Sequence, residues 1–444
     1  MKNIKTVLCF IFIALLCLNK PMVLAETNTE QQVITANITA PKLCTDNKIS
    51  THSSVSEIKI TSDLPLSHIY IVFWDTPVDF TLQGSNTEVT QKGEFLHRLI
   101  ELPPELKTQK EITVKFEKTA NISEISAYNN MPGNKQNWQP NNTEADLLLF
   151  STHADDEQLF FAGTLPKYAL DGETEVQVVY FTDHNNNILR RHELLDGLWA
   201  VGVRRYPVIS FLPDAYSESY EGAIANLKKA GFSEDDALNF QIEQIRKFKP
   251  LVILGHDLKG EYGHGQHILN ATLLTQAVIK ANDSTAHQSS FELYGLWDTP
   301  KLYLHLYKEN QLVLDLDTEI AGLGKTPFQI SKEGFACHGT QQATWFKTWL
   351  NGKNNEITKA TQITKYAPGV FGLYRTTVGP DILKTDLFEN VTKRSLIPPP
   401  EPEPPEQTPT PPKNNNFWQI SLVFVLMAVV SPVALFVFKK IKAK

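Results

Sequence analysis

The stretch Leu147-Leu148-Leu149-Phe150-Ser151-Thr152-His153-Ala154-Asp155-Asp156-Glu157 joins an apolar run to a histidine and three carboxylates. The run is long enough for one strand, and its uninterrupted apolar character predicts a sheet covered on both faces. The acidic cluster then lies at the carboxyl end of the strand, which is where open α/β sheets bind their ligands. The stretch therefore predicts an α/β fold with a polar site at this edge.

The acidic cluster alone has two interpretations. His153 and Asp156 are different kinds of metal ligand, and Asp155 between them would be free to serve as the base in metal-assisted hydrolysis. An acid-rich strand end is also typical of a helix N-cap, because carboxylates favour the positive end of a helix.

A second motif favours the metal. Tyr262-Gly263-His264-Gly265-Gln266-His267 follows another apolar run, Leu251-Val252-Ile253-Leu254. Histidines three residues apart share one face if a helix begins near Gln266. His267 would then complete a zinc site with three protein ligands and one open position, leaving His264 free beside it.

Together the two motifs resemble the LmbE-like (PIG-L) family of zinc-dependent de-N-acetylases, over roughly residues 146–375. That family carries His-Pro-Asp-Asp-Glu after its first strand and Gly-His-x-x-His after a later one. The resemblance implies that Zn2+ is the cofactor, with another divalent ion such as Fe2+ as the alternative. The implied ligands are His153, Asp156 and His267.

The resemblance also implies catalytic roles for the residues around the ligands. Asp155 would be the general base, His264 the general acid or an oxyanion donor, and Tyr262 a contact to the tetrahedral intermediate. Arg190, in Arg190-x-x-Glu193, would lie near the substrate. His338, in His338-Gly339-Thr340-Gln341, resembles a late substrate-binding element, although a structural histidine is an equal interpretation.

Two departures from the family pattern stand at these motifs. Ala154 replaces the usual proline, which loosens the loop because proline fixes φ. Gly265-Gln266 replaces the usual Pro-Asp and removes a carboxylate that could orient a ligand. Neither change removes an implied ligand or the base, so we expect an active enzyme.

Further polar residues follow the predicted strands. For Asp183 and His184 a solvated loop is the preferred interpretation. His256 and Asp257 are equally well explained as partners that orient a ligand or as ordinary loop residues. His305 alternates like a strand position and is most simply a packed residue.

Strands and helices alternate from residue 146 onward. Apolar runs at 147–150, 176–181, 208–211 and 251–254 are separated by predicted helices near 157–168, 191–201 and up to 247. This alternation predicts a Rossmann-like, mostly parallel sheet over 141–395. Both motifs then follow strands that end at one edge of the sheet.

The segment 26–140 has a different pattern. Short runs at 57–60, 68–73 and 112–116 are broken by Pro, Asn and Gly, which predicts a small β-sandwich. Trp74 or Trp138 could serve as a sugar-stacking platform there. Burial of both in a core or interface is the preferred interpretation, because large aromatics are mostly buried.

The two ends of the chain carry targeting patterns. Residues 1–25 read as a cleaved signal peptide. A proline-rich linker at 396–416 precedes an uncharged stretch at 417–438, long enough to span a bilayer, and a basic tail at 439–444. The lysines predict a cytoplasmic tail, hence a single-pass cell-membrane protein with an extracellular catalytic body.

Charge and cysteine content narrow the function further. The formal net charge of −7 disfavours a nucleic-acid partner. Cys44 and Cys337 are too few for a disulfide framework. The leading hypothesis is a deacetylase acting on an N-acetylated sugar or a cell-surface glycan. The alternatives are a glycan-binding protein without turnover and an amidase acting on sugar-linked thiols.

Overall fold

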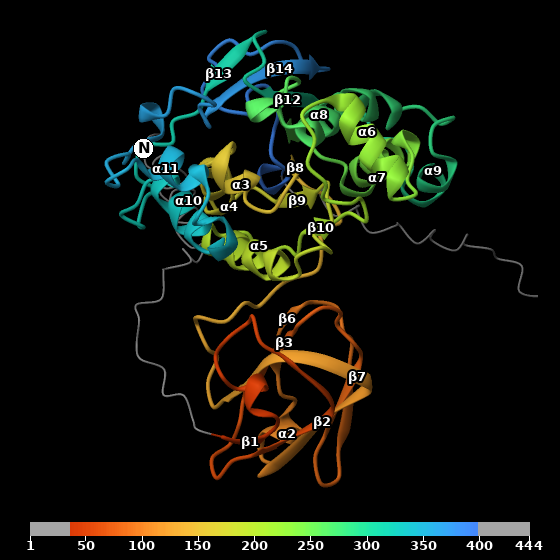
Figure 1. Cartoon of the computed structure of the whole chain (residues 1–444), viewed down its shortest axis with the longest axis vertical. Helices are drawn as coiled ribbons and strands as arrows, with labels where there is room; N and C mark the ends of the chain where they lie inside the picture. The colour runs from red at the N-terminus through yellow and green to blue at the C-terminus, as the bar shows by residue number, and fades with distance from the viewer. Residues whose placement is uncertain (1–35, 398–444) are drawn as a thin grey trace, which may run out of the picture. The chain divides into compact units, whose positions relative to one another are not determined.

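Two β-sheets organise the chain in the computed structural model, which describes residues 36–397 (Figure 1). Strands β1–β7 form the first sheet and β8–β14 the second. Helices flank the second sheet, whereas only short helical turns accompany the first. The prediction of a mixed α/β chain is confirmed.

The first sheet is entirely antiparallel and is centred on the long strand β7. β7 pairs with β2, β3 and β4 and thereby joins them into one hydrogen-bonded sheet. The finer description of this region as a sandwich therefore stays a prediction. The strands are β1 (Asn37–Thr39), β2 (Ser53–Thr61), β3 (His68–Phe73), β4 (Phe80–Gln83), β5 (Glu88–Gln91), β6 (His97–Glu101) and β7 (Glu111–Tyr128).

The second sheet has the order β10-β9-β8-β11-β12-β14-β13. Its first five strands are parallel, and β14 and β13 add an antiparallel edge. Because the parallel strands share one direction, the loops after β8, β9, β10 and β11 meet at one edge. The strands are β8 (Leu147–Ser151), β9 (Val176–Tyr180), β10 (Val208–Ile209), β11 (Val252–Gly255), β12 (Lys301–His305), β13 (Gln311–Val313) and β14 (Val370–Thr376).

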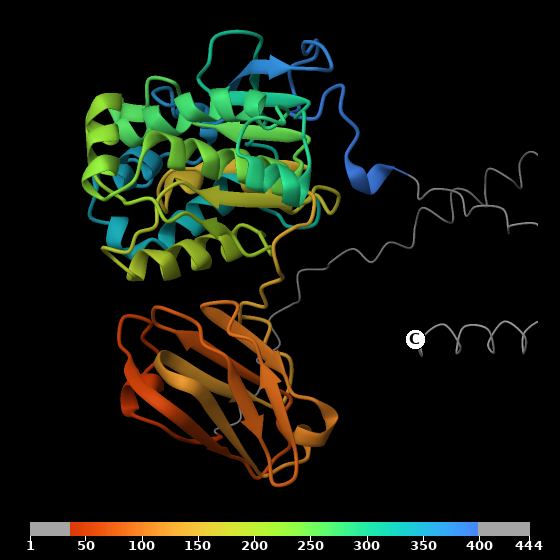
Figure 2. The same cartoon turned by 90° about the vertical axis from the view of Figure 1, so that its right-hand side faces the viewer.

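Helices cover both faces of the second sheet, as Figure 2 shows. In β8, Leu147 and Leu149 belong to one core, and Leu148 and Phe150 belong to the other. Successive side chains of a strand point to opposite faces, so a continuous apolar run feeds both cores. The burial of all five residues of β8 follows from this arrangement.

A helix on each face of the sheet begins with a capping box. α7 starts with a capping box between Ser233 and Asp236, and α10 with one between Thr326 and Gln329. The single helix predicted near 157–168 is interrupted at Gly163, whose φ is 84°. The α-helices are α2 (Pro104–Lys107), α3 (Asp156–Leu159), α4 (Thr164–Ala169), α5 (Leu189–Ala200), α6 (Tyr220–Lys229), α7 (Glu234–Phe248), α8 (Gly265–Lys280), α9 (Gln288–Tyr294), α10 (Pro327–Ala336) and α11 (Trp345–Asn351).

The expected localisation as a single-pass membrane protein needs correction. Between residues 36 and 397, no helix combines the length and the apolar character needed to cross a bilayer. The expected signal peptide at 1–25 and the expected span at 417–438 lie outside the described residues, as do the tail and nearly all of the linker. The single-pass, extracellular assignment is therefore withdrawn.

The two tryptophans considered as sugar platforms are packed. Trp138 is buried and donates its indole N–H to Gln136. Trp74 stacks on His52 and His192, with ring centroids 4.9 and 5.6 Å apart. These contacts agree with the preferred interpretation that both rings are packing residues.

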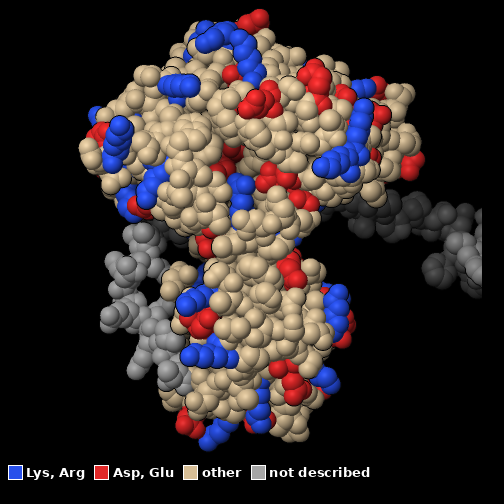
Figure 3. Space-filling model, viewed as in Figure 1, with Lys and Arg blue, Asp and Glu red and all other residues tan. Residues whose placement is uncertain are grey.

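Charged side chains of both signs are dispersed over one face of the molecule. Basic and acidic groups alternate on the face seen in Figure 3, without a broad area of one sign. Cys44 and Cys337 are both free thiols. Packing and hydrogen bonds, rather than a bridge between these two residues, hold residues 36–397 together.

Candidate metal and catalytic site

Three side chains named from the sequence meet at the edge of the second sheet. His153 Nδ1 lies 3.2 Å from Asp156 Oδ2 and 3.1 Å from His267 Nε2. His267 Nε2 lies 3.1 Å from the same Asp156 oxygen. The three atoms form a nearly equilateral triangle within buried side chains.

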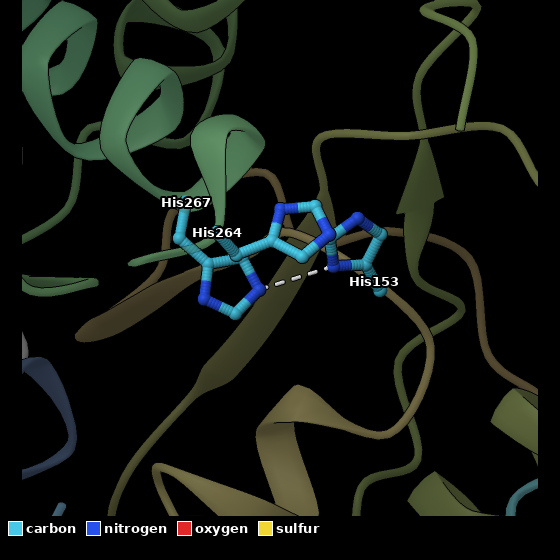
Figure 4. Close-up of side chains that lie close together, drawn as sticks. All are labelled: His153, His264 and His267. Atoms are coloured by element: carbon cyan, nitrogen blue, oxygen red, sulfur yellow. Dashed lines mark hydrogen bonds between the residues drawn. The ribbon is translucent and has the colours of Figure 1, made fainter. Parts of the chain in front are cut away.

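Two loops supply this triangle. His153 follows β8, and Asp156 opens α3, so only Ala154 and Asp155 separate them. His267 lies in the first turn of α8, whose N-cap is His264. Figure 4 shows the rings of His153, His264 and His267 turned toward one another.

The imidazole of His153 is oriented by an amide. His153 Nε2 lies 3.0 Å from Gln266 Oε1 and 3.5 Å from Asp214 Oδ1. An N–H at Nε2 satisfies these acceptors, which leaves the lone pair of Nδ1 directed at the triangle. Gln266 thus performs the orienting role that the departure from the family pattern put in doubt.

The imidazole of His267 is oriented by a carboxylate. Its Nδ1 lies 2.7 Å from Glu261 Oε2, so Nε2 presents its lone pair to the triangle. The fully buried Glu261 also accepts from His256 Nδ1 at 2.8 Å and from His305 Nδ1 at 2.7 Å. This carboxylate therefore fixes the tautomers of His256 and His267, whereas His305 Nε2 faces a second acceptor, Ala367 O, at 3.0 Å.

The triangle fits a divalent metal ion. Ligands at about 2.0–2.1 Å from zinc stand about 3.0–3.4 Å apart in tetrahedral or octahedral geometry, which matches the observed spacing. Two imidazole nitrogens and a carboxylate oxygen also form a typical zinc donor set. His256 does not compete for this role, because its Nε2 accepts the Thr152 N–H at 3.0 Å.

Without a metal ion, Asp156 stays ionised and His267 stays protonated. Burial alone would lower the pKa of His267, but the neighbouring Asp156 carboxylate raises it to about 10. Burial opposes the charge on Asp156, yet His267 and His153 hold the pKa of that carboxyl well below its usual range. The pair therefore holds a proton that a bound cation would replace.

Asp155 lies beside the triangle in a strained conformation, with φ 114° and ψ −29°. Its N–H donates to Glu157 Oε2 at 3.0 Å, and Arg190 Nη2 lies 3.4 Å from its Oδ1. Burial raises the pKa of Asp155 to about 7, while Arg190 opposes that rise. Arg190 also donates to Ala154 O at 2.6 Å, which fixes the loop that carries the carboxylate.

His264 and Tyr262 line the same site. The His264 ring centroid is 4.6 Å from that of His153 and 5.6 Å from that of Tyr262. His264 Nδ1 accepts the Gln266 N–H at 3.2 Å, and burial followed by the charge of His153 lowers the His264 pKa to about 2. Burial raises the pKa of Tyr262 well above its usual value, so its hydroxyl stays protonated.

One expectation about a neighbouring histidine needs correction. His184 is fully buried rather than solvated: its Nε2 accepts the Ala154 N–H at 2.7 Å, and its Nδ1 lies 2.9 Å from Asp214. His338 is also fully buried, with Nε2 3.2 Å from Glu157 Oε1. This burial favours the interpretation of His338 as a structural histidine, and its substrate contact stays a prediction.

Sequence reasoning missed two acidic residues and misjudged a third position. Asp214 bonds His184 and Arg190 from a loop with no motif of its own. Glu261 precedes Tyr262 directly, and its place inside the second motif was the signal available for it. The sequence did not predict that Gln266 orients His153. An amide can orient a histidine as a carboxylate does.

Comparisons with known proteins match this part of the chain. Residues 148–278 match the family model described as PIG-L, GlcNAc-PI de-N-acetylase. The 1D-myo-inositol 2-acetamido-2-deoxy-alpha-D-glucopyranoside deacetylase of Rhodococcus erythropolis (strain PR4 / NBRC 100887) is 28% identical over 184 residues, which cover 35% of this chain and 59% of that protein. The chain thus spans about three fifths of the length of this relative.

Two further proteins are similar to this chain. A protein of Streptomyces scabiei (strain 87.22) with the same name is 22% identical over 279 residues, covering 56% of this chain and 85% of that protein. The N,N'-diacetylchitobiose deacetylase from Pyrococcus horikoshii aligns in structure with a TM-score of 0.35 and 16% identity, covering 52% of this chain and 84% of that chain. Residues 148–278 thus match the PIG-L (LmbE-like) family model, and the relatives that match the chain are named deacetylases.

Proposed function

We propose that this protein is a metal-dependent deacetylase that hydrolyses the N-acetyl group of an N-acetylglucosamine-type sugar. The observation that carries the proposal is the triangle of His153 Nδ1, Asp156 Oδ2 and His267 Nε2, with pairwise distances of 3.1–3.2 Å. A buried carboxylate, Asp155, stands beside it. A hydrolytic metal site needs metal ligands and an adjacent base.

His153, Asp156 and His267 would hold the ion, for which Zn2+ is the first choice and Fe2+ the alternative. When bound, the ion would polarise the amide carbonyl and lower the pKa of water. Gln266 and Glu261 would keep both imidazoles in the tautomer that can bind it.

Asp155 would accept the proton of the attacking water. A general base works best when its pKa lies near the operating pH, and burial raises the pKa of Asp155 to about 7. Arg190, 3.4 Å from this carboxylate, favours its ionised form and limits its rotation.

His264 and Tyr262 would stabilise the oxygen that becomes negative as the amide is attacked. Because His264 Nδ1 accepts the Gln266 N–H, its hydrogen is on Nε2, where it can be donated. The Tyr262 hydroxyl is a second donor. Donors fixed before the reaction lower its barrier without reorganising. Because His264 is neutral, the proton that the leaving amine takes up would come from Asp155, which received it from the attacking water.

The finer fold assignment belongs to the same proposal. The parallel strands β10-β9-β8-β11-β12 support a Rossmann-like sheet within 141–395. The seven antiparallel strands before it support a β-sandwich accessory domain within 26–140.

Acetate release from N-acetylated sugars, with and without a chelator, tests the function. Parent protein should release acetate, and the chelator should abolish the release until Zn2+ is restored. Asp155→Asn should lower the rate by roughly 10²–10⁴, whereas the matched control Asp257→Asn, whose carboxylate bonds only the Lys259 N–H among the described residues, should keep it. Full activity of Asp155→Asn would refute the assigned roles, and stoichiometric metal without acetate release would favour a glycan-binding protein.

A further inference from the structure

Four aromatic side chains form a row through the candidate site, which we call the ring row: Trp345, Tyr262, His264 and Tyr216. Consecutive ring centroids lie 5.7, 5.6 and 5.1 Å apart. The interplanar angles are 84°, 86° and 89°, so each ring meets the next edge to face. The row connects three separate segments: the start of α11, the motif before α8 and the loop after β10.

The row is exposed at its two ends and shielded in its middle. Trp345 is 47% exposed and Tyr216 is 64% exposed, whereas His264 is buried and Tyr262 is half-buried. Large aromatic rings are normally covered, so two open rings that both touch residues of one site need an explanation. Trp345 contacts Tyr262, and Tyr216 contacts His264, so each open ring adjoins a different residue of the reactive centre.

The loop that carries Tyr216 is fixed in place by α8. Gly265 N–H donates to Ser217 O at 2.8 Å, Ala215 N–H to Gln266 Oε1 at 3.2 Å, and Gln266 Nε2 to Pro213 O at 2.7 Å. A Cβ at position 265 would overlap the Ser219 carbonyl oxygen, so only glycine permits this approach. Tyr216 is therefore held beside His264 before any ligand arrives.

The turn that leads to Trp345 is also anchored. Thr340 N–H and Oγ1 bond Glu193 at 2.8 and 2.5 Å, and Thr344 Oγ1 donates to Gln341 O at 2.7 Å. The Trp345 ring packs on Phe346, with centroids 4.3 Å apart. Both exposed rings thus stand on preorganised backbone, which lowers the entropic cost of binding a ligand against them.

From this arrangement we infer that Trp345 and Tyr216 are stacking platforms for sugar units on both sides of the unit that is deacetylated. The inferred substrate is an oligosaccharide or polysaccharide of N-acetylated sugars, and this inference rests on the proposed function. A pyranose ring has an apolar C–H face and a polar rim. Open aromatic faces next to polar groups match both parts of such a ring. Glu218 is one of these polar groups and accepts from the Tyr216 hydroxyl at 3.1 Å.

The test compares binding of two probes, N-acetylglucosamine and its β-1,4-linked tetramer, by titration calorimetry with Zn2+-loaded full-length Asp155→Asn protein. The tetramer should bind more tightly than the monosaccharide. Adding Trp345→Ala or Tyr216→Ala should weaken tetramer binding by roughly five- to tenfold, because one aromatic contact is lost. Trp345→Phe should recover most of the loss, and the control Tyr374→Ala, an exposed tyrosine on β14, should bind like the parent.

Several outcomes would overturn the inference. Equal affinity for tetramer and monosaccharide would do so, as would alanine variants that bind the tetramer like the parent. An octyl glycoside of N-acetylglucosamine that gains as much affinity as the tetramer, and loses it in Trp345→Ala, would assign the rings to an apolar group instead. Acetate release by the parent with Asp155 intact is measured alongside, so a failed inference is distinguished from a failed deacetylase proposal.

Discussion

Replacing Glu261 by glutamine is the sharpest test of how the site is held. Glu261 Oε2 accepts from His256 and His267, and Oε1 accepts from His305 and from the Asp257 N–H at 3.1 Å. An amide has one oxygen and one NH2 group. Turned one way, its NH2 group faces the His256 and His267 donors. Turned the other way, it faces the Asp257 N–H, while His305 can carry its hydrogen on Nε2 and donate to Ala367 O, so at least one donor faces another donor.

The magnitude follows from those contacts. Each unsatisfied buried donor costs about 1–3 kcal/mol, so the free energy of unfolding should fall by at least about 1–3 kcal/mol. Loss of the negative charge also makes His267 a weaker ligand. Removing such a supporting partner lowers metal affinity about 10- to 100-fold, which corresponds to about 1.4–2.7 kcal/mol.

Two assays check the prediction. Urea unfolding of the metal-free protein measures the stability change, and competition with a chromophoric chelator measures Zn2+ affinity. Glu319→Gln, an exposed glutamate outside the site, is the matched control and should resemble the parent in both. A Glu261→Gln protein that binds Zn2+ within twofold of the parent would refute the idea that this carboxylate prepares His267.

Three further changes have defined outcomes. Asp155→Asn should retain stoichiometric Zn2+ by elemental analysis while losing acetate release, because Asp155 is not part of the triangle; loss of the metal would reassign it as a ligand. Asp381→Ala should lower the free energy of unfolding by about 3–5 kcal/mol in urea, since it leaves the fully buried Lys301, now 2.5 Å from that carboxylate, without a counter-charge. Ala154→Pro restores the family residue but removes the N–H that His184 accepts at 2.7 Å, so the midpoint of thermal unfolding should fall; an unchanged or higher midpoint would contradict the role given to that bond.

The sequence identified the parts of the site that depend on local spacing. His153, Asp155 and Asp156 fall within one turn after a strand, and His264 and His267 within the first turn of a helix. Such arrangements follow from the period of the element. Convergence of the two motifs follows from parallel strands, because their carboxyl ends share one edge. The triangle of ligand atoms could therefore be anticipated.

The features that could not be predicted from the sequence depend on contacts between distant segments. His184 looked like a loop residue, yet Asp214 from the next βα loop and the Ala154 N–H bury it. Composition gives no signal for a partner 30 residues away. The break of the predicted helix is similar, because α3 ends at Leu159 and the left-handed Gly163 starts a second helix, α4. Local pattern predicts elements, and tertiary contacts decide which polar residues they enclose.

The departures from the family pattern at 265 and 266 are best understood together. The amide at 266 has an acceptor for His153 and a donor for Pro213, so it orients a ligand and also ties down the following loop. A carboxylate would supply the first contact and not the second. Glycine at 265 lets that loop lie against α8 and donates to Ser217. Compared with the family pattern, Gly265-Gln266 thus lacks a carboxylate beside the candidate metal site but holds the loop that carries Tyr216 in place. The same two residues therefore link the orientation of His153 to the surface where the substrate is inferred to bind.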